Sequence, residues 1–411
     1  MSLAADRHPR EFDKDHEENI MSDTVTLDRQ TTRSKVDYRI IDADQHLNPP
    51  HDFWKDYLPA NLQHLAPYIE SAEDADYLIF EGSRRKINIM HALAGVKAKD
   101  FKMEGRVKDF RRGSFDPAGR IEDMDMDGVD VAVIYGGGPL GTANKELFLE
   151  SFNAYNRFVM DFALHDRARL CPVSYIPMVD VADSVARLKV LAKMGFTVIN
   201  IPAYPFDLDS LTASGAQVHS LTGNMNAEKL YDDPMYDPFW AAAAEHDIAL
   251  TFHLGGRVTR FTNKQRILAD MLASKFAMAE TPSTMIFGGV FDRFPGLKIG
   301  TIESGGGWLA FAADYMDRTW EKQRFWTEST LKNLPSFYMA QNIYASFIHD
   351  RVAIETCHLP GAKNVMWSSD YPHSETTFPE SQDWIERLFK GISEQDKKMI
   401  LCDTAEKFFR V

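Results

Sequence analysis

Short apolar runs and amphipathic stretches alternate along most of this chain. The apolar runs, which predict buried strands, cover residues 129–135, 170–177, 196–202, 248–254, 298–303, 343–347 and 364–370. Stretches with helical periodicity lie between them, at residues 120–127, 146–165, 181–194, 237–246, 264–279, 308–325 and 350–358. Together with a strand that begins at Ile40, the pattern gives eight strands alternating with helices. Such alternation predicts parallel strands joined by helical crossovers, so we expect an α/β fold of the (β/α)8 TIM-barrel type.

The first predicted strand, residues 40–50, carries an unusual set of polar side chains. Its two leading isoleucines are followed by Asp42-Ala-Asp44-Gln-His46, and a double proline then ends the strand. Alternation along a strand places Asp42, Asp44 and His46 on one face. Burying three such groups is costly without a metal ion or strong partners. A carboxylate pair bonded to backbone, with His46 on a surface loop, is the alternative.

Two segments fall outside the regular alternation. Residues 1–36 are polar, acid-rich and without periodicity, so we expect a disordered N-terminal extension, for which Met21 is an alternative start. Residues 37–411 then form the barrel domain. Within it, residues 50–116 are an insertion after the first strand, with a short helical region and a hairpin that turns at a glycine. This insertion is either a lid over the mouth of the site or a surface decoration.

Composition narrows the classes of protein. The chain has 411 residues, of which 44% are hydrophobic, enough for a large buried core. No apolar run is long enough to span a bilayer and no signal-peptide pattern is present, so we expect a cytoplasmic protein without a membrane partner. Three widely spaced cysteines predict reduced thiols. A net charge of −14, without a basic stripe to offset it, argues against a nucleic-acid partner. The partner that we expect is a small-molecule substrate.

Polar residues also recur where later strands end. His253 closes the fifth predicted strand, Glu303 the sixth and Asp370 the eighth, with His373 shortly after. Taken singly, a buried histidine is typical of core hydrogen bonding and such an aspartate is typical of a helix cap. Catalytic groups of a TIM barrel lie at the carboxyl ends of its strands, so the recurrence predicts one shared site. The predicted metal ligands are Asp44, His46, His253, Glu303 and Asp370.

Six local sequences occur in an order that resembles a known family. They are Asp-Ala-Asp-Gln-His at 42–46, Arg-Ile-Glu-Asp-Met-Asp-Met-Asp-Gly-Val-Asp at 120–130, Tyr-Asp-Pro-Phe-Trp at 236–240, Phe-Asp-Arg-Phe-Pro at 291–295, Glu-Ser-Gly-Gly-Gly-Trp at 303–308 and Ser-Asp-Tyr-Pro-His at 369–373. From about residue 40 to residue 409 the chain resembles the amidohydrolase superfamily, within it the amidohydrolase-related group of aminocarboxymuconate-semialdehyde decarboxylase-like and aromatic-acid decarboxylase-like enzymes. The resemblance implies one divalent metal held by a His-x-His pair on strand one, a histidine on strand five and the strand-eight aspartate. Strand six often supplies another histidine.

The chain departs from that pattern at the metal site. Asp44 stands where the first histidine would be, Glu303 stands where the strand-six histidine would be, and Pro49 replaces a glutamate of related sequences. Two imidazoles with three carboxylates form a harder site than a histidine-rich one, which favours iron or manganese over zinc. We therefore expect a divalent metal cofactor, as one or two ions of zinc, iron or manganese.

The predicted function is metal-dependent hydrolysis or decarboxylation of a small carboxylated or carbonyl substrate. A divalent ion activates a bound water or holds a carboxylate, and Asp370, His253 and His373 are the predicted catalytic residues. Arg257 and Arg260 are predicted anchors for a substrate anion, with surface-loop arginines as the alternative reading.

Two other classes of function stay open from the sequence. The two-histidine, carboxylate-rich set also resembles non-haem diiron centres, so a TIM-barrel diiron oxygenase acting on a coenzyme A-linked substrate is the alternative enzyme. A metal-binding barrel without catalysis is the other alternative. Large barrels of this kind often form homodimers, and the sequence leaves dimerisation open.

Overall fold

Parallel strands form the centre of the molecule, which the computed structural model describes at residues 34–49, 53–136, 138–211, 222–254 and 264–411. The barrel strands are β1 (Ile41–Leu47), β5 (Val131–Gly136), β6 (Leu170–Pro172), β7 (Ser174–Tyr175), β8 (Val198–Asn200), β9 (Ala249–His253), β10 (Ile299–Ile302), β11 (Ile343–Phe347) and β12 (Val365–Trp367). They pair in the order β1-β5-β6 and β7-β8-β9-β10-β11-β12, always in parallel. Because β6 and β7 are separated only by Val173, they continue one position of the barrel.

The barrel closes between β1 and the segment that follows β12. Gln45 and Tyr371 form a parallel bridge there, and the His46 amide donates to the Tyr371 carbonyl at 2.6 Å. The predicted (β/α)8 barrel with an insertion after its first strand is therefore confirmed.

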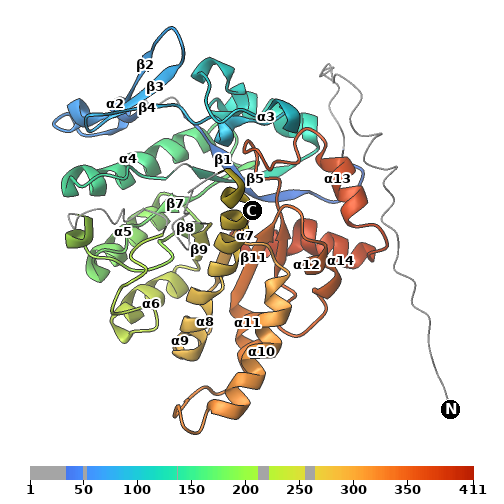
Figure 1. Cartoon of the computed structure of the whole chain (residues 1–411). Helices are drawn as coiled ribbons and strands as arrows, with labels where there is room; N and C mark the ends of the chain where they lie inside the picture. The colour runs from blue at the N-terminus through green and yellow to red at the C-terminus, as the bar shows by residue number, and fades with distance from the viewer. Residues whose placement is uncertain (1–33, 50–52, 137, 212–221, 255–263) are drawn as a thin grey trace.

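Helices follow the strands and cover the outside of the barrel (Figure 1). They are α2 (Phe53–Tyr57), α3 (Pro117–Asp127), α4 (Lys145–Ala163), α5 (Val181–Lys193), α6 (Asp237–Glu245), α7 (Lys264–Ala277), α8 (Glu280–Phe287), α9 (Val290–Arg293), α10 (Trp308–Gln323), α11 (Pro335–Asn342), α12 (Arg351–Thr356), α13 (Ser381–Leu388), α14 (Glu394–Lys398) and α15 (Thr404–Phe409). Side-chain caps explain several starts: Asp116, Asn144 and Asp180 each accept a backbone N–H three residues on. No helix in the described part of the chain is both long and apolar enough to cross a membrane.

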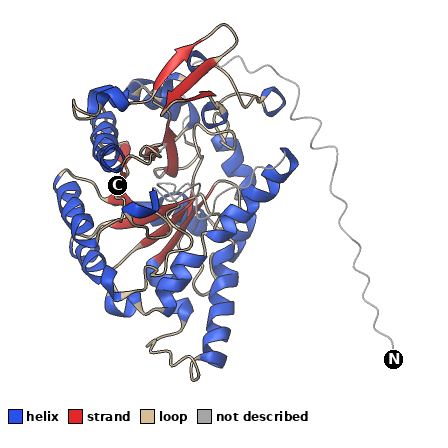
Figure 2. Cartoon of the chain, turned by 60° about the vertical axis from the view of Figure 1, so that its left-hand side comes forward, coloured by secondary structure: helices blue, strands red, loops and turns tan. Residues whose placement is uncertain are grey.

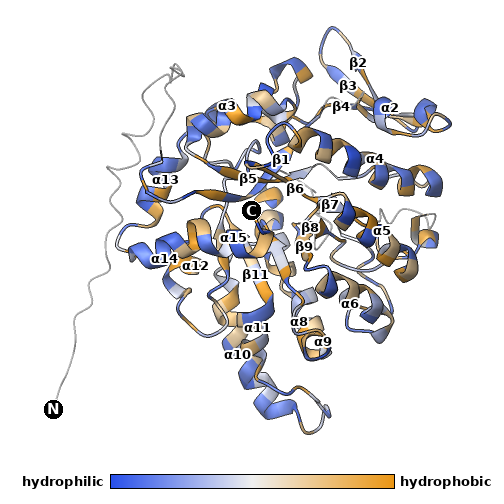
Figure 3. Cartoon of the chain, turned by 180° about the vertical axis from the view of Figure 1, so that it is seen from behind, coloured by the Kyte–Doolittle hydropathy of each residue, from blue (hydrophilic) through white to orange (hydrophobic). Residues whose placement is uncertain are grey.

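The strands are buried on both faces, one facing the barrel interior and one facing the helices. All residues of β5, β9 and β11 are buried. Figure 3 shows hydrophobic residues concentrated on these central strands and mixed polarity on the surrounding helices. Because both faces are covered, the strands read as continuous apolar runs in the sequence, and this made them recognisable.

Three details differ from the sequence-based expectations. The predicted strand at residues 170–177 is divided at Val173, and the one at 364–370 ends at Trp367. The expectation that Asp42 shares a face with Asp44 and His46 is wrong, because the pairing of β1 with β5 shifts register between Asp42 and Gln45. Asp42 instead accepts hydrogen bonds from the Ser369 amide at 2.9 Å and from Gln45 Nε2 at 2.8 Å.

The insertion forms a small antiparallel sheet of its own. Its strands are β2 (Tyr68–Ser71), β3 (Asp76–Phe80) and β4 (Ser83–Lys86), and Figure 2 shows them at the top, apart from the barrel strands. The turn between β3 and β4 places Glu81 and Gly82 at φ of 48° and 73°, as the predicted glycine turn requires. Downstream of this sheet, the Ala94 amide donates to the Pro372 carbonyl and the Ser374 amide donates to the Met90 carbonyl, each at 3.0 Å. The insertion is thus tied to the loop that follows β12.

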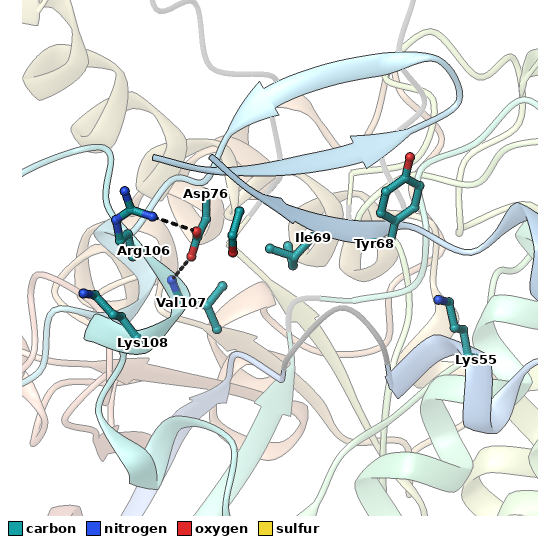
Figure 4. A pocket seen from close by; sticks show the side chains of 8 residues that line it. Lys55, Tyr68, Ile69, Asp76, Arg106, Val107 and Lys108 are labelled. Atoms are coloured by element: carbon teal, nitrogen blue, oxygen red, sulfur yellow. Dashed lines mark hydrogen bonds and ion pairs between the residues drawn. The ribbon is translucent and has the colours of Figure 1, made fainter. Parts of the chain in front are cut away.

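A hollow of about 520 Å³ lies under this small sheet (Figure 4). Buried Asp76 at its edge accepts from the Val107 amide at 2.9 Å and pairs with Arg106 at 3.3 Å. Since these groups satisfy one another, we assign this corner a structural role, attaching the turn at Val107 to the sheet.

The boundary of the N-terminal extension generates a prediction. Residues 1–33 lie outside the described residues, whereas Lys35 pairs with Glu386 at 2.8 Å and Asp383 at 3.0 Å, and Val36 packs against the core. Deleting residues 1–33 should leave the melting temperature within about 1 °C. Deleting residues 1–36 should lower it by about 1–3 °C, because two exposed ion pairs and one half-buried valine contribute little. A loss of many degrees in the shorter deletion, measured by calorimetry, would mean that residues 1–33 dock on the barrel.

Candidate metal centre

The five predicted ligands meet at the carboxyl end of the barrel. Asp44 and His46 lie on β1, His253 is the last residue of β9, Glu303 directly follows β10, and Asp370 lies three residues beyond β12. All five side chains are buried, and their donor atoms form two overlapping groups within 4.8 Å, one of which adds His373. Parallel strands bring their carboxyl ends to one rim, so residues far apart in sequence become neighbours.

The donor atoms point at a common volume. His46 Nε2 lies 3.2 Å from Asp44 Oδ1 and 3.2 Å from Asp370 Oδ1. His253 Nε2 lies 3.3 Å from Asp44 Oδ1 and 3.9 Å from Glu303 Oε2. The two imidazoles meet edge to face, with ring centroids 4.9 Å apart. Each ligand candidate therefore presents an atom to the same small space.

Several of these atoms lack a hydrogen-bond partner. Asp44 Oδ2, His46 Nε2 and Asp370 Oδ1 are buried and make no hydrogen bond of acceptable geometry within the described residues, although His46 Nε2 and Asp370 Oδ1 lie within ion-pair distance of each other. Buried polar atoms without partners are rare, because each costs free energy comparable to a lost hydrogen bond. A divalent cation satisfies all of them, and a set of carboxylate oxygens with two imidazole nitrogens suits a hard to intermediate ion. The residues present thus fit a metal ion.

The charges of the cluster support the same reading. Burial opposes the charged form of His46, but the nearby Asp44 and Asp370 carboxylates outweigh it and raise the pKa of His46 to about 10. Burial, with the neighbouring Asp370 charge, raises the pKa of Glu303 well above its ordinary value. His46 and Glu303 therefore retain protons in the absence of an ion, and a bound cation would take the place of those protons.

Two of the clustered carboxylates belong to residues with a strained backbone conformation. Glu303 and Asp370 both have a φ of 58°, a left-handed conformation that costs a non-glycine residue about 1–3 kcal/mol. The Glu303 amide donates to Ser346 Oγ at 2.8 Å, and the Asp370 amide donates to the Asp44 carbonyl at 3.1 Å. These bonds hold both turns, and the two carboxylates project into the cluster.

Glu303 is not needed as a helix cap. The amides of Gly306 and Gly307, at the start of α10, both donate to Asp350 Oδ2, at 2.9 Å and 2.8 Å. Since Asp350 satisfies these donors, the buried Glu303 carboxylate is left for the cluster.

The remaining predicted site residues divide into two groups. His373 lies against the cluster, with its Nδ1 2.9 Å from Asp370 Oδ1 and its ring stacked on His46 at 3.9 Å. Arg257 and Arg260 lie outside the described residues, so their predicted role as substrate anchors stays a prediction.

Three residues near the cluster were missed from the sequence. Lys275 Nζ of α7 donates to the Glu303 carbonyl at 3.2 Å and lies 3.8 Å from Glu303 Oε1. His91 of the insertion meets the His373 ring at 5.1 Å, and buried Tyr135 of β5 meets the His253 ring at 5.0 Å. Tyr135 also ends a predicted strand, a signal that could have identified it. No local pattern marks the other two, because tertiary packing alone brings them there.

A cavity of about 470 Å³ adjoins the cluster at Glu303. One wall is apolar and includes Leu272, Phe276, Trp308 and Phe347, while Lys275 and Glu375 supply polar groups beside Glu303. A cavity of this size and lining accepts a small molecule with an apolar body.

Comparisons with known proteins agree with this geometry. A sequence profile of the family described as amidohydrolase matches residues 41–411. A 2-amino-3-carboxymuconate-6-semialdehyde decarboxylase from Dictyostelium discoideum is 23% identical over 304 residues, which cover 72% of this chain and 76% of the relative. The crystal structure of an amidohydrolase from Mycobacterium avium subsp. paratuberculosis K-10 has a TM-score of 0.67 at 19% identity, covering 91% of this chain and all of that one.

A second solved structure was determined with its metal. A dihydroxybenzoic acid decarboxylase from Polaromonas sp. JS666, with bound manganese and the inhibitor 2-nitroresorcinol, has a TM-score of 0.60 at 18% identity, covering 90% of this chain and 97% of that one.

The barrel and its buried donors define the class as a metal-dependent TIM-barrel enzyme, a hydrolase or carboxy-lyase. Within that class, the chain belongs to the amidohydrolase family, since the matching profile spans nearly all of the barrel. The comparisons give the diiron oxygenase alternative no support.

The clearest test of the cluster is the loss of one carboxylate. Glu303→Gln keeps the side-chain shape but removes its charge, so manganese affinity should fall by at least about tenfold while the fold persists. Asp370→Asn and His253→Ala should act in the same direction. Glu375→Gln is the matched control, because Glu375 lies 3.7 Å from Lys275 but is not among the clustered donors. Full metal content with near-normal activity in Glu303→Gln would rule out a ligand role for this residue.

Proposed function

We propose that this chain is a metal-dependent decarboxylase of a small substrate with an apolar, aromatic-like body. The observation that carries the proposal is the buried cluster of three carboxylates and two imidazoles opening beside a cavity with an apolar wall. The ligands are Asp44, His46, His253, Glu303 and Asp370. Their oxygen-rich composition favours manganese or iron over zinc.

The metal supplies one part of the chemistry. A divalent ion bound by these residues would hold a substrate carboxylate and a neighbouring oxygen, and would stabilise the negative charge left as carbon dioxide departs.

The apolar wall supplies a second part. Phe276, Trp308 and Phe347 line the cavity that adjoins Glu303. An apolar substrate body packed on them excludes water from the reacting carbon. In such surroundings, loss of a charged carboxylate as neutral carbon dioxide is favoured over its retention.

A proton must also reach the carbon that loses carbon dioxide. Asp370 Oδ1 lies 2.9 Å from His373 Nδ1, and the His373 side chain is 19% exposed, whereas Asp370 is buried. The pair therefore links the cluster to solvent and can carry a proton inward. In a hydrolytic reaction, the same pair would instead accept a proton from the attacking water.

Decarboxylation is preferred to hydrolysis because of the named relatives. The curated relative from Dictyostelium discoideum and the solved structure from Polaromonas are both decarboxylases.

The insertion at residues 50–116 is proposed as the lid of this cavity, since its backbone bonds to the loop after β12. The cytoplasmic location and the lack of a nucleic-acid partner remain predictions.

Isotopic labelling separates the two reactions. With manganese-loaded protein in D2O and a dihydroxybenzoate or a carboxymuconate semialdehyde as the probe, decarboxylation should release carbon dioxide and place deuterium on the carbon that carried it. With amides and lactones in H2¹⁸O, hydrolysis would instead place ¹⁸O in a product acid. Metal-free protein and Asp370→Asn are the controls. Incorporation of ¹⁸O without any release of carbon dioxide would make the enzyme a hydrolase.

We propose in addition that the protein forms a homodimer. Five large apolar side chains on α7 and α10 are between 57% and 72% exposed: Leu268, Leu272, Phe276, Phe311 and Tyr315. Together they expose on the order of 500 Å² of apolar surface, which is at the upper end for the largest apolar patch of a monomer. This area is over half of the ~800 Å² that each partner buries in a standard protein–protein interface. A second copy of this chain would present the same apolar side chains and could bury them against this face. Leu272 and Phe276 also line the cavity, so the partner would help to close it.

Analytical ultracentrifugation tests this interface. The wild type should sediment as a dimer at micromolar concentration, and the double variant Phe311→Glu with Tyr315→Glu should be monomeric, because two charges cannot be buried there without partners. Val190→Glu, on α5 and 57% exposed, is the matched control and should remain dimeric. A monomeric wild type would contradict the proposal.

A further inference from the structure

A buried arginine lies next to the metal cluster without belonging to it. Arg120 of α3 is fully buried, and its guanidinium donates to three oxygens: Nε to the Gly113 carbonyl at 2.8 Å, Nη1 to Gln45 Oε1 at 3.0 Å, and Nη2 to the His46 carbonyl. Two of these acceptors belong to β1, and one of those is the backbone of a proposed ligand.

The other face of the guanidinium covers Tyr371, with the carbon 4.5 Å from the ring centroid. Tyr371 directly follows the proposed ligand Asp370, and its carbonyl accepts the His46 amide at 2.6 Å. Arg120 therefore contacts β1 and the segment after β12 at the same time.

A second series of hydrogen bonds connects Arg120 to Ser369, the residue that precedes Asp370. Gln45, which accepts from Arg120, donates through Nε2 to Asp42 at 2.8 Å, and Asp42 accepts from the Ser369 amide at 2.9 Å. The residues held in this way flank ligands: Gln45 lies between Asp44 and His46, and Ser369 precedes Asp370.

The position of these contacts matters because the barrel closes there through an isolated bridge and not through a ladder of paired strands. Neighbouring barrel strands pair through ladders of residues, whereas β1 meets the segment after β12 in one bridge, Gln45 with Tyr371. Along this seam, within the described residues, the Asp370 amide donates to the Asp44 carbonyl and the His46 amide donates to the Tyr371 carbonyl, and the contacts of Arg120 add to these two backbone hydrogen bonds. The guanidinium is planar and its donors form a rigid fork. Its hydrogen bonds therefore fix the relative positions of the segments that they join, as the hydrogen bonds of a sheet would.

We propose that Arg120 is a positioning residue that holds the β1 and β12 ligands of the metal site at one fixed separation across the seam of the barrel. The inference rests on the proposed metal site and goes beyond it. A hydrophobic side chain would fill the same space without the desolvation cost of a buried cation. The hydrogen bonds to three oriented acceptors therefore explain why an arginine occupies this position. Arg120 touches neither metal nor substrate, and acts through the backbone of His46 and the ring of Tyr371.

Manganese affinity, measured by competition with a metallochromic chelator, tests the proposal. Arg120→Met should weaken it by at least tenfold, because the ligands lose their fixed spacing. Arg120→Lys, which keeps the charge and can reach the His46 carbonyl, should recover part of this loss. If Arg120 acted only through its charge, removing a cation would strengthen manganese binding instead, so the sign of the change is decisive.

A matched control separates positioning from general stability. Asp127 lies on the same helix, is buried, accepts hydrogen bonds from Ser381 of α13, and is not among the clustered donors. Asp127→Ala should lower the melting temperature but leave manganese affinity within twofold. Gln45→Met cuts the link to Asp42 while leaving Arg120 in place, and should weaken manganese binding severalfold.

The manganese-affinity measurements distinguish failure of the proposed function from failure of the positioning role of Arg120. A wild-type protein that binds no manganese refutes the proposed function. A wild type that binds manganese, with unchanged affinity in Arg120→Met, refutes the positioning role alone. If Arg120→Met does not fold, Arg120→Lys and Gln45→Met decide: wild-type affinity in both overturns the proposal, and weakened affinity in both supports it.

Discussion

The structure depends on one constraint: carboxylates and imidazoles that are buried together must be satisfied. Asp44, His46, His253, Glu303 and Asp370 share a small volume away from water, and three of their polar atoms make no hydrogen bond within the described residues. Isolated charges in such surroundings would cost many kcal/mol, so the cluster is stable only with a cation or with protons in its place. The eight-position barrel, the left-handed turns at Glu303 and Asp370, and the bonds at the seam all serve to hold these groups in this arrangement.

The left-handed turns show how local strain is linked to function. Glu303 directly follows β10 and Asp370 lies three residues beyond β12, and at both residues the backbone leaves the extended conformation of a strand. The turns aim both side chains inward, and hydrogen bonds from their amides to Ser346 and Asp44 keep them there. Strain of about 1–3 kcal/mol at each residue is small beside the free energy of binding a divalent ion to several charged ligands.

The sequence allowed the fold and the cluster to be predicted, because both follow from simple periodicities. Strands buried on both faces are continuous apolar runs, and the carboxyl ends of parallel strands must meet, so His253, Glu303 and Asp370 could be placed together from spacing alone. Asp42 could not be placed correctly, because a register shift within β1 turns it toward Ser369. Lys275 and His91 come from a helix and from the insertion, where tertiary packing and not local pattern decides the neighbours.

The most direct measurement of the central claim is anomalous diffraction at the manganese edge from crystals grown with Mn²⁺ and no chelator. We predict one strong peak at the carboxyl end of the barrel, about 2.0–2.4 Å from donor atoms of Asp44, His46, His253, Glu303 and Asp370. A strong peak at another position, or none at this cluster in protein that binds manganese in solution, would contradict it.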